Sequence, residues 1–437
     1  MKNVAVVGLG FVGLTLSVVA SKKGFKTYGI DLNGKILNSI KSCKAHFHEN
    51  GINSAIESVY NEFLFVSDSF ERFKVNRFKY IIITVGTPLK DGKKPNLDHL
   101  ISALKVIKPI YDGSQLLILR STVSVGTTRQ IVLPYICKEY GLNPKDVLLS
   151  FCPERTVEGN ALQELCELPQ IIGALNQKSY ELSENFFRKI TPTLLKVDSI
   201  EAAELVKLFN NTYRDIEFSV GNYFNQIAQS FGINGVDLIK SANYLYPRSK
   251  IALPGLVGGP CLEKDSYILV DKMPNNKGKD FVLGARKHNE SIDKLVAEWI
   301  IRNINSENIN RIGLSGMAFK GIPETSDLRG SPSINILRYL QSKTNINYRI
   351  HDYLVPIDEL NDYSQGYNCF EEFCKNLELL VILTNSNKYK NYSSVYLKKF
   401  LKPKCIIFDL WGILDFSYKK NFKVTTLGDM FKEGARY

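Results

Sequence analysis

Short strand-like runs alternate with helix-like stretches over the first 197 residues of the chain. The apolar run Val4–Val7 precedes a stretch of helical periodicity, and a second run, Lys26–Ile30, follows it. The alternation continues with the runs Phe63–Val66, Tyr80–Val85, Gln115–Leu119, Val147–Phe151 and Gln170–Ile172, and with helix-like stretches such as Leu97–Ile110 and Thr128–Tyr140. Strands that alternate with helices in this way predict a parallel sheet covered by helices on both faces.

The pattern changes at Ile200. From there to Phe231 the residues follow a long helical period with no proline and one glycine, and further helical segments continue to about Asn303. A second strand-rich block begins at Asn310, with strands expected at Arg311–Ser315, Tyr348–Asp352, Leu379–Thr384 and Cys405–Asp409. We therefore predict an α/β protein with two doubly wound domains, residues 1–197 and 304–437, joined by a long helical spine, residues 198–303.

Composition places the chain among ordinary globular proteins. Of its 437 residues, 44% are hydrophobic, 11% aromatic and 23% charged, which excludes disorder as the main state. No unbroken apolar run reaches the roughly 18 to 20 residues that span a bilayer, so we expect no membrane-spanning segment. The length fits two or three domains.

Charge and cysteine content narrow the range of partners. The chain has 56 basic and 44 acidic residues, a net charge of +12, and the basic residues are dispersed. This distribution does not indicate a nucleic-acid binder, and it suits anionic small molecules such as nucleotides. The eight cysteines form no CxxC pair, which is typical of a reduced intracellular protein. His46 and His48 lack a third ligand of suitable spacing, so no metal is expected.

The N-terminal glycines form the first candidate site. Gly8, Gly10 and Gly13 follow the first strand in the order GxGxxG and open a helix-like stretch. Such glycines allow a tight turn, close approach of a pyrophosphate and close packing of the helix on the strand. The basic start and the apolar stretch also fit a secretory signal peptide. The series of strand, glycines, helix, strand and terminal acid favours a dinucleotide site.

The terminal acid of this series indicates NAD. Asp31 ends the second strand, and its carboxylate is expected to accept hydrogen bonds from the adenosine ribose hydroxyls. The same charge would repel the 2′-phosphate of NADP. Lys35 stands four residues later, where it weakens this preference slightly or is simply a solvated helix lysine.

A degraded glycine signature opens the C-terminal block. Gly313 and Gly316 stand at its first strand, and Asp352 ends the next one. Lys320 in the following turn and Arg329 soon after carry the charge that phosphate groups attract, so we favour a site for a phosphorylated nucleotide. The alternative is a structural copy of the first domain without a ligand.

A cysteine lies where the helical spine ends, in the segment GGPCLEKD at residues 258–265. The glycines allow a sharp turn and Pro260 suits the first turn of a helix, which places Cys261 at a helix N-terminus, where the dipole lowers the pKa of a thiol. Asp265, four residues on, is expected on the same face. We interpret the pair as a reactive thiolate near a carboxylate; a buried structural cysteine is the alternative.

Three polar residues share one face of the predicted spine helix. Glu204, Lys207 and Asn211 stand three and four residues apart. A solvated helix surface is the usual position for such residues. The apolar residues at 205, 206, 208 and 209 also allow the lysine to face an interior cleft, where an ammonium and an amide one turn apart suit a developing oxyanion.

Several motifs occur together in the order of one enzyme family. They are Gly8 to Gly13, Val85-Gly86-Thr87-Pro88, Ser121-Thr122-Val123-x-x-Gly126, Pro153-Glu154-Arg155, Lys207-x-x-x-Asn211, Gly258-Gly259-x-Cys261-x-x-Lys264-Asp265 and Ala318-Phe319-Lys320-Gly321. This series resembles the UDP-sugar 6-dehydrogenases, the family of UDP-glucose and UDP-N-acetylhexosamine dehydrogenases, over about residues 1–425. The fold implied is two Rossmann-like domains joined by a helical dimerisation spine.

The resemblance implies a four-electron oxidation at C6 of the sugar with two NAD in succession. Cys261 resembles the nucleophile that captures the aldehyde as a thiohemiacetal, which becomes a thioester and is released by water as the uronate. Lys207 and Asn211 resemble the pair that stabilises the oxyanion.

Water and proton transfer are assigned by the same resemblance. Asp265 and Thr122 resemble the residues that hold and activate water. Glu154 resembles the acid/base glutamate of the Pro-Glu motif, and Glu158 is the next carboxylate on the same loop.

Binding residues and partners also follow from the resemblance. The expected NAD contacts are Gly8, Gly10, Phe11, Val12, Gly13, Asp31, Lys35, Thr87, Thr122 and Glu158. The expected UDP-sugar contacts are Arg155, Lys207, Asn211, Arg248, Gly255, Gly258, Phe319, Lys320 and Arg329, with Arg248 reaching the site of a neighbouring subunit. The resemblance implies a homodimer packed along the spine and a cytoplasmic enzyme that supplies a uronic acid for surface polysaccharide.

Two residues depart from the family pattern and bear on the sugar. Glu263 stands where the glucose branch has proline, and Ser326 stands where an aspartate is common. The Gly-Gly-Pro-Cys motif resembles the glucose branch, whereas Pro-Glu-Arg resembles the N-acetylhexosamine branch, which we favour in its UDP-N-acetylmannosamine type. A one-step hydroxyacid dehydrogenase would lack the cysteine loop, and a catalytically silent nucleotide-sugar sensor would not need all the matched side chains.

Overall fold

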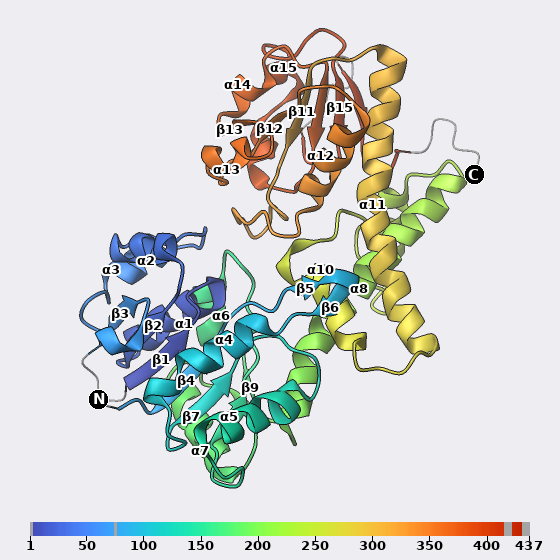
Figure 1. Ribbon diagram of the computed structural model, residues 1–437. Helices are drawn as coiled ribbons and strands as arrows, with labels where there is room; N and C mark the ends of the chain where they lie inside the picture. The colour runs from blue at the N-terminus through green and yellow to red at the C-terminus, as the bar shows by residue number, and fades with distance from the viewer. Residues whose placement is uncertain (1–2, 74–76, 415–421, 431–437) are drawn as a thin grey trace. The chain divides into compact units, whose positions relative to one another are not determined.

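The computed structural model describes residues 3–73, 77–414 and 422–430. The chain divides into two compact units: Met1–Asn211 with Tyr267–Pro274, and Thr212–Ser266 with Asn275–Tyr437. The boundary falls within two helices, α8 (Ile200–Ser230) and α10 (Gly259–Val270), so each of these helices contributes residues to both units. Figure 1 shows the elements in chain order.

The first unit is built on an eight-stranded sheet in the order β10-β9-β8-β7-β4-β1-β2-β3. All neighbouring strands are parallel except β8 and β9, which are antiparallel. The strands are β1 (Asn3–Val7), β2 (Lys26–Ile30), β3 (Leu64–Ser67), β4 (Tyr80–Ile83), β7 (Leu116–Leu119), β8 (Leu149–Phe151), β9 (Gln170–Ala174) and β10 (Leu194–Lys196). A separate hairpin joins β5 (Leu89–Lys90) to β6 (Lys94–Pro95).

Helices cover both faces of this sheet, and each face has its own apolar core. The helices are α1 (Phe11–Lys22), α2 (Gly34–Lys41), α3 (Ile52–Glu57), α4 (Asp98–Val106), α5 (Leu133–Tyr140), α6 (Ala161–Glu167) and α7 (Gln177–Phe187). The close packing of α1 on the sheet depends on Gly13, because a Cβ there would lie 1.8 Å from the carbonyl oxygen of Gly8. The doubly wound fold predicted for this part is confirmed.

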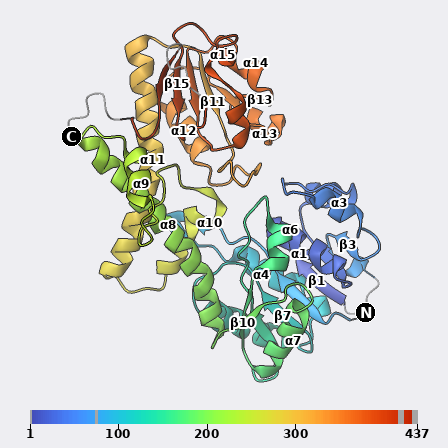
Figure 2. The same cartoon turned by 180° about the vertical axis from the view of Figure 1, so that it is seen from behind.

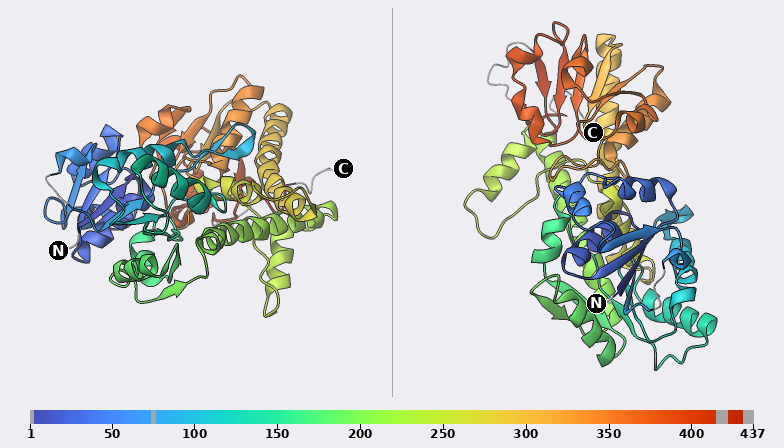
Figure 3. Two further views of the ribbon diagram at one scale, coloured as in Figure 1. Left: turned by 60° about the horizontal axis from the view of Figure 1, so that its bottom comes forward. Right: turned by 90° about the vertical axis from the view of Figure 1, so that its left-hand side faces the viewer.

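The spine consists of long helices. After α8 come α9 (Gly235–Asn243), α10 and α11 (Lys277–Glu307), and both α8 and α11 have 31 residues. Figure 3 shows α11, in yellow to gold, as one continuous helix. Within the second unit α8 and α11 are joined by buried polar contacts, among them a hydrogen bond of 3.0 Å from Nδ2 of Asn222 to Oδ1 of Asn289.

The C-terminal sheet has six parallel strands in the order β13-β12-β11-β14-β15-β16. They are β11 (Ile312–Ser315), β12 (Arg349–His351), β13 (Gln365–Tyr367), β14 (Leu379–Ile382), β15 (Ile406–Asp409) and β16 (Lys423–Thr425). One core lies between the sheet and α11 and α12 (Pro332–Lys343), and the other includes α14 (Phe370–Cys374) and α15 (Ser394–Leu397). Figure 2 shows α12 and α14 on either side of this sheet; α13 (Ile357–Asn361) precedes β13.

The sequence pattern predicted the longer elements and missed the shortest strands. β10, β13 and β16 have three residues each, none of them buried, so they carry no apolar run that could be recognised. The helix expected from Thr128 begins as a π-helical turn, Thr128–Val132, before α5. Short 3-10 helices occur at Phe70–Arg72, Asp91–Lys93, Lys108–Ile110 and Asn387–Asn391.

A helix long and apolar enough to cross a membrane is absent from the described ranges of the chain. The three-part division at residues 197 and 303 stays a prediction.

Candidate active site

A cavity of about 500 Å³ lies at the carboxyl ends of β1, β2 and β4 in the first unit. Gly8 follows β1 with φ +90°, a left-handed conformation that glycine adopts without strain, and α1 begins after Gly10. Apart from its two neighbours in the chain, no described residue has an atom within 4 Å of the position of a Cβ at Gly10. A phosphate group can therefore approach the first amides of α1.

Asp31 lines the same cavity and is half-buried. Its carboxylate accepts hydrogen bonds of 2.8 Å from the amides of Leu9 and Asn33, which fixes its direction at the end of β2. A carboxylate placed beside the glycine turn suits the ribose hydroxyls of a dinucleotide. The cavity, the open helix start and this acid together fit NAD.

The structure places the predicted cofactor residues in two groups. Gly8, Gly10 and Asp31 line the cavity. The others do not line it: Phe11, Val12, Gly13, Lys35, Thr87, Thr122 and Glu158. The Lys35 side chain is exposed, whereas Gly13 serves the packing of α1.

One wall of the cavity was missed by sequence reasoning. It is formed by one face of α4, at His99, Ser102, Ala103 and Val106. His99 Nδ1 lies 3.1 Å from the carbonyl oxygen of Gly86, next to the end of β4. Spacings of three, one and three residues mark one helix face, so the sequence did contain a pattern for this wall. That pattern does not tell which ligand the face contacts.

The two loops that follow β4 and β7 are joined by hydroxyl groups. Ser121 Oγ donates to the carbonyl of Val85 over 2.6 Å, and Thr87 Oγ1 donates to the carbonyl of Thr122. Thr122 itself is half-buried. These bonds fix the position of the Thr122 backbone relative to the glycine cavity within the same unit.

Glu204 stabilises the same loop from α8. Its carboxylate accepts from the amide of Gly126 at 2.6 Å, and from the amide and hydroxyl of Thr128 at 2.9 and 2.6 Å. Glu204, Lys207 and Asn211 are 1%, 7% and 8% exposed, so the solvated alternative for this helix face is wrong. Glu204 therefore has a structural part, while Lys207 and Asn211 remain the candidates for chemistry.

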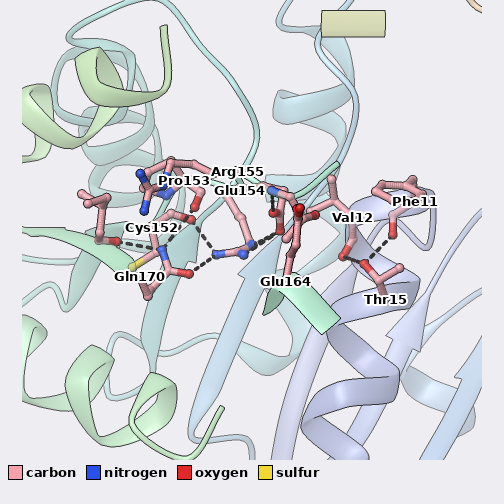
Figure 4. A network of polar contacts seen from close by, with 12 residues as sticks. Phe11, Val12, Thr15, Cys152, Pro153, Glu154, Arg155, Glu164 and Gln170 are labelled. Atoms are coloured by element: carbon pink, nitrogen blue, oxygen red, sulfur yellow. Dashed lines mark hydrogen bonds and ion pairs between the residues drawn. The ribbon is translucent and has the colours of Figure 1, made fainter. Parts of the chain in front are cut away.

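Glu154 lies in a buried polar network at the carboxyl ends of β7 and β8, shown in Figure 4. Arg120 donates from Nη2 and Nε to Oε2 of Glu154 over 2.6 and 3.1 Å. The amide of Thr156 donates to Oε1 over 2.6 Å. Burial would raise the pKa of the Glu154 carboxyl, but Arg120, the Thr156 amide and the charge of Lys207 outweigh it and lower that pKa.

Arg155, the next residue on this loop, points elsewhere. Arg155 Nη2 donates to the carbonyl of Pro169, so its side chain contacts the start of β9. Burial lowers the pKa of the Arg155 guanidinium. Glu158 is half-buried. Sequence reasoning placed Arg155 among the substrate contacts, which stays a prediction.

The cysteine segment belongs to the second unit. Cys261 is exposed in the first turn of α10, as its motif predicted, and the alternative of a buried structural cysteine is wrong. Asp265 on the next turn is buried, and Lys264 Nζ donates to its Oδ1 over 2.7 Å. Burial would lower the pKa of the Lys264 amine, but Asp265 and Cys261 outweigh it and raise that pKa. The Lys264 ammonium therefore interacts electrostatically with the thiol of Cys261, three residues before it in the chain.

A buried network supports the backbone on both sides of Cys261. Arg286 on α11 donates to the carbonyls of Val257 and Leu262 over 3.0 and 3.1 Å. Asn222 on α8 donates to the carbonyl of Gly255 and accepts from its amide, over 3.0 and 2.8 Å. Sequence reasoning did not single out Asn222 or Arg286 and so missed this support.

The C-terminal domain packs on the same segment within the second unit. The amide of Gly259 donates to the carbonyl of Gly330 over 2.8 Å. A Cβ at Gly259 would lie 2.4 Å from the ring of Phe319, so this glycine allows the ring to pack directly on the turn before Cys261. Gly258 also faces the carbonyl of Gly330, the residue after Arg329. The predicted substrate residues Gly258, Phe319 and Arg329 therefore belong to segments that pack together.

Three basic residues predicted for the substrate differ in their contacts. The Lys320 ammonium lies 5.3 Å from the centre of the Phe319 ring. Arg329 pairs with Asp327 over 2.6 Å, with its side chain 67% exposed. Arg248 is exposed and stacks on Tyr246, with the guanidinium carbon 4.8 Å from the ring centre.

The acid of the second glycine signature differs from Asp31 in its surroundings. Asp352 is buried and its Oδ2 accepts from the amides of Met317 and Ala318 over 2.9 and 3.0 Å. Burial raises the pKa of this carboxyl. Asp352 therefore closes the turn after β11, and it lines a small pocket together with Lys320.

Metal chemistry has no candidate in the described part of the chain, where no group of three histidine, cysteine, aspartate or glutamate residues could hold an ion.

The chain matches known proteins over nearly its whole length. Three models of the UDP-glucose/GDP-mannose dehydrogenase family match it: the NAD binding domain at residues 2–191, the central domain at 201–291 and the UDP binding domain at 313–416. It is 31% identical to a UDP-N-acetyl-D-mannosamine dehydrogenase of Methanococcus vannielii, over 98% of this chain and 97% of that one.

Solved structures show the same similarity. The UDP-N-acetyl-D-mannosamine dehydrogenase of Pyrococcus horikoshii superposes with a TM-score of 0.87 at 28% identity, covering 98% of this chain and 100% of that one. The UDP-N-acetyl-mannosamine dehydrogenase of Staphylococcus aureus gives a TM-score of 0.84 at 26% identity, covering 98% and 99%.

Proposed function

Because the chain belongs to the UDP-glucose/GDP-mannose dehydrogenase family, we propose that it oxidises the C6 hydroxymethyl group of a UDP-N-acetylhexosamine to a carboxylate. It is an NAD-dependent oxidoreductase of UDP-sugars, and the family resemblance drawn from its motifs is confirmed. The observation that carries the two-step reaction is Cys261, an exposed thiol at a helix start within a firmly supported turn.

The proposed reaction removes four electrons from C6. NAD, when bound, would supply the hydride acceptor for each of the two oxidation steps. The first step converts the hydroxymethyl group to an aldehyde and releases one proton. The Cys261 thiol adds to the aldehyde carbon as a thiohemiacetal, which loses the second hydride and a second proton to become a thioester. Water then cleaves the C–S bond, which restores the thiol, forms the carboxylate and releases a third proton.

We assign the remaining roles to residues whose burial and contacts suit them. Lys207 and Asn211 are buried donors one helical turn apart. We assign them the role of stabilising the negative charge that develops on the C6 oxygen. Asp265 and Thr122 are assigned to the water of the final step. Glu154 supplies the buried carboxylate whose charge is coupled to Lys207.

The UDP part is assigned to the C-terminal domain. The family model for UDP binding matches residues 313–416, which contain Phe319, Lys320 and Arg329. Phe319 packs on the turn before Cys261, so a nucleotide held near this ring would be placed close to the thiol. All three of the compared relatives are named for N-acetylmannosamine, which favours UDP-N-acetylmannosamine as the substrate over the alternative, UDP-glucose.

A turnover assay with a panel of sugars tests the proposal. The purified protein is incubated with NAD and with UDP-glucose, UDP-N-acetylglucosamine, UDP-N-acetylgalactosamine or UDP-N-acetylmannosamine, and NADH and products are measured. Two NADH per uronate from the N-acetylmannosamine sugar is the expected result. One NADH with accumulated aldehyde would contradict the two-step mechanism, and binding without NADH from any sugar would favour a sensor.

A pair of cysteine variants sharpens this assay. Cys261→Ser is expected to abolish uronate formation while NAD still binds. Cys369→Ser is the matched control, because Cys369 is also exposed but lies in the C-terminal domain, where it contacts Glu371. An unchanged rate of uronate formation in Cys261→Ser would remove this residue from the role of nucleophile.

We further propose a homodimer formed through the spine. In the second unit, the C-terminal half of α8, α9 and the loop after it expose a series of large apolar side chains: Tyr223, Phe224, Ile227, Phe231, Leu238, Tyr244 and Leu245. Exposed apolar side chains gathered on neighbouring elements are typical of a protein–protein interface. Light scattering is expected to give twice the chain mass. Leu238→Asp is expected to lower the measured mass, whereas Ile357→Asp on α13 is expected to leave it unchanged.

The cytoplasmic location stays a prediction.

A further inference from the structure

We infer that Glu154 acts as a permanently ionised carboxylate, and that Arg120 is the positioning residue that keeps it ionised. The inference rests on the proposed function, because it refines the part played by one residue of that site. Family resemblance assigns Glu154 an acid/base role. The contacts of its two oxygens support a narrower one.

Both oxygens of Glu154 face groups that can only donate. Oε2 accepts two bonds from Arg120, and Oε1 accepts one from the backbone amide of Thr156. A protonated carboxyl would need an acceptor for its own hydrogen, and a guanidinium and an amide offer none. Protonation would therefore break at least one short bond in a site that is 6% exposed, without a replacement.

Arg120 is itself held on its remaining edge. Its Nη1 donates to the carbonyl of Cys152 over 3.0 Å and to Oε1 of Gln170 over 2.8 Å. Gln170 uses its amide nitrogen for the carbonyls of Pro153 and Ile171, at 3.2 and 2.8 Å, which fixes the direction of its oxygen. Figure 4 shows Gln170 and Glu154 within this network. These bonds hold the Arg120 guanidinium in one orientation, in which Nε and Nη2 donate to Glu154.

The sheet order explains why these groups meet. Arg120 follows β7 and Glu154 follows β8, so both stand at the carboxyl edge of the sheet. Because β9 is antiparallel to β8, its first residue, Gln170, lies at the same edge. Arg120 and Lys207 are buried cations, and the charge of each favours an ionised Glu154 carboxylate. A single carboxylate that stays ionised is needed to offset them.

The first test uses stability, which does not depend on turnover. Thermal unfolding of Arg120→Gln is compared with the unaltered protein at pH 5 and pH 8. We expect the loss in Tm to be larger at pH 8, because the buried carboxylate left without its partner can take up a proton at pH 5. Arg129→Gln is the matched control, since Arg129 pairs with Glu201 near the surface and belongs to no proposed site. An equal loss at both pH values would overturn the inference.

The second test uses the pH profile of kcat. Glu154→Gln is expected to lower kcat on the order of 100-fold and to keep the acid limb of the profile, because Glu154 does not titrate there. Arg120→Gln is expected to move the acid limb to higher pH, and Arg120→Lys to move it less. Loss of the acid limb in Glu154→Gln would identify an acid/base group and overturn the inference.

The two tests distinguish a failure of the proposed function from a failure of the inference about Glu154. A protein that turns over no sugar refutes the proposed function, while the stability comparison still decides the state of Glu154. If Arg120→Gln does not fold, Gln170→Ala replaces it, because this change removes one contact of Arg120 and no charge. If Glu154 stays ionised throughout, proton transfer belongs to other groups, of which Glu158 is the next carboxylate on the loop.

Discussion

Arg286 and Asp215 form a salt bridge inside the second unit, with Nη1 of the arginine 2.8 Å from Oδ1 of the aspartate and the two side chains 2% and 1% exposed. The pair joins α11 to α8. The same guanidinium donates to the carbonyls of Val257 and Leu262, which flank Cys261. One buried ion pair therefore fixes both the helix packing and the turn that presents the thiol.

Removal of Arg286 should be costly. Arg286→Met leaves Asp215 as a buried charge without its cation, and we expect a loss of about 3–5 kcal/mol in the free energy of unfolding, measured by urea denaturation. Arg338→Met on α12 is the control, because this arginine is exposed and its loss should change stability by less than about 0.5 kcal/mol. Equal midpoints for the two variants would show that the ion pair is not stabilising.

Asp31 should decide the choice between NAD and NADP. Asp31→Ala removes the carboxylate at the end of β2 and also its bond to the Leu9 amide, so NAD binding is expected to weaken on the order of 10-fold. The preference for NAD over NADP should fall with it, since the charge that repels the 2′-phosphate is gone. Calorimetric titration of both dinucleotides measures this. Asp68→Asn, at an exposed pair with Arg72, should change neither affinity.

Gly259 should not tolerate a side chain. Its φ is +91°, and a Cβ would lie 2.4 Å from the ring of Phe319, so Gly259→Ala combines backbone strain with a clash. We expect a loss of stability of about 1–3 kcal/mol and a fall in turnover, because Phe319 and the turn before Cys261 must separate. Gly284→Ala on α11 is the matched control.

The control has the opposite expectation. A Cβ at Gly284 meets no atom within 4 Å, so alanine there should stabilise the helix by about 0.5–1 kcal/mol. If Gly259→Ala were as stable as Gly284→Ala, the turn would be looser than the structure indicates.

His351 should make the C-terminal domain sensitive to acid. Its ring is buried at the end of β12, 2.8 Å from Ser315 Oγ, and burial lowers its pKa to about 3. Above pH 6.5 the ring is neutral in both the folded and unfolded chain. Below it only the unfolded chain takes up the proton, so this residue removes about 1.4 kcal/mol of stability per pH unit down to about pH 3.

His351→Phe isolates that contribution. The ring already lies among Tyr353, Phe370 and Phe373, so phenylalanine is compatible with its surroundings. The difference in unfolding free energy between the variant and the unaltered protein should be constant above pH 7 and should shift in favour of the variant between pH 6.5 and 4. Parallel curves over that range would contradict the assignment.

The local motifs could be predicted from the sequence because neighbours along the chain determine them. The strand and helix alternation, the turn at Gly8 and Gly10, and the helix start at Cys261 each depend on fewer than about fifteen consecutive residues. Their backbone geometry follows from residue type, so the fold class and the position of the thiol were available before any tertiary contact was known.

Long-range partners could not be predicted in this way. The face of α4 that completes the dinucleotide cavity carried a readable helical spacing, but nothing in that spacing tells which sheet edge it covers. Glu204 was singled out with Lys207 and Asn211, yet only the structure separates its contact with the Thr128 loop from the positions of the other two.

By itself the sequence determined the longer elements, the order of the motifs and the candidate residues for chemistry. The tertiary structure alone decided which charges are buried together: Arg120 with Glu154, which are 34 positions apart, and Arg286 with Asp215, which are 71 apart. The reason is physical. An ionised side chain is favourable in the interior only beside its partner, and the strand order and helix packing that bring partners together are properties of the whole chain.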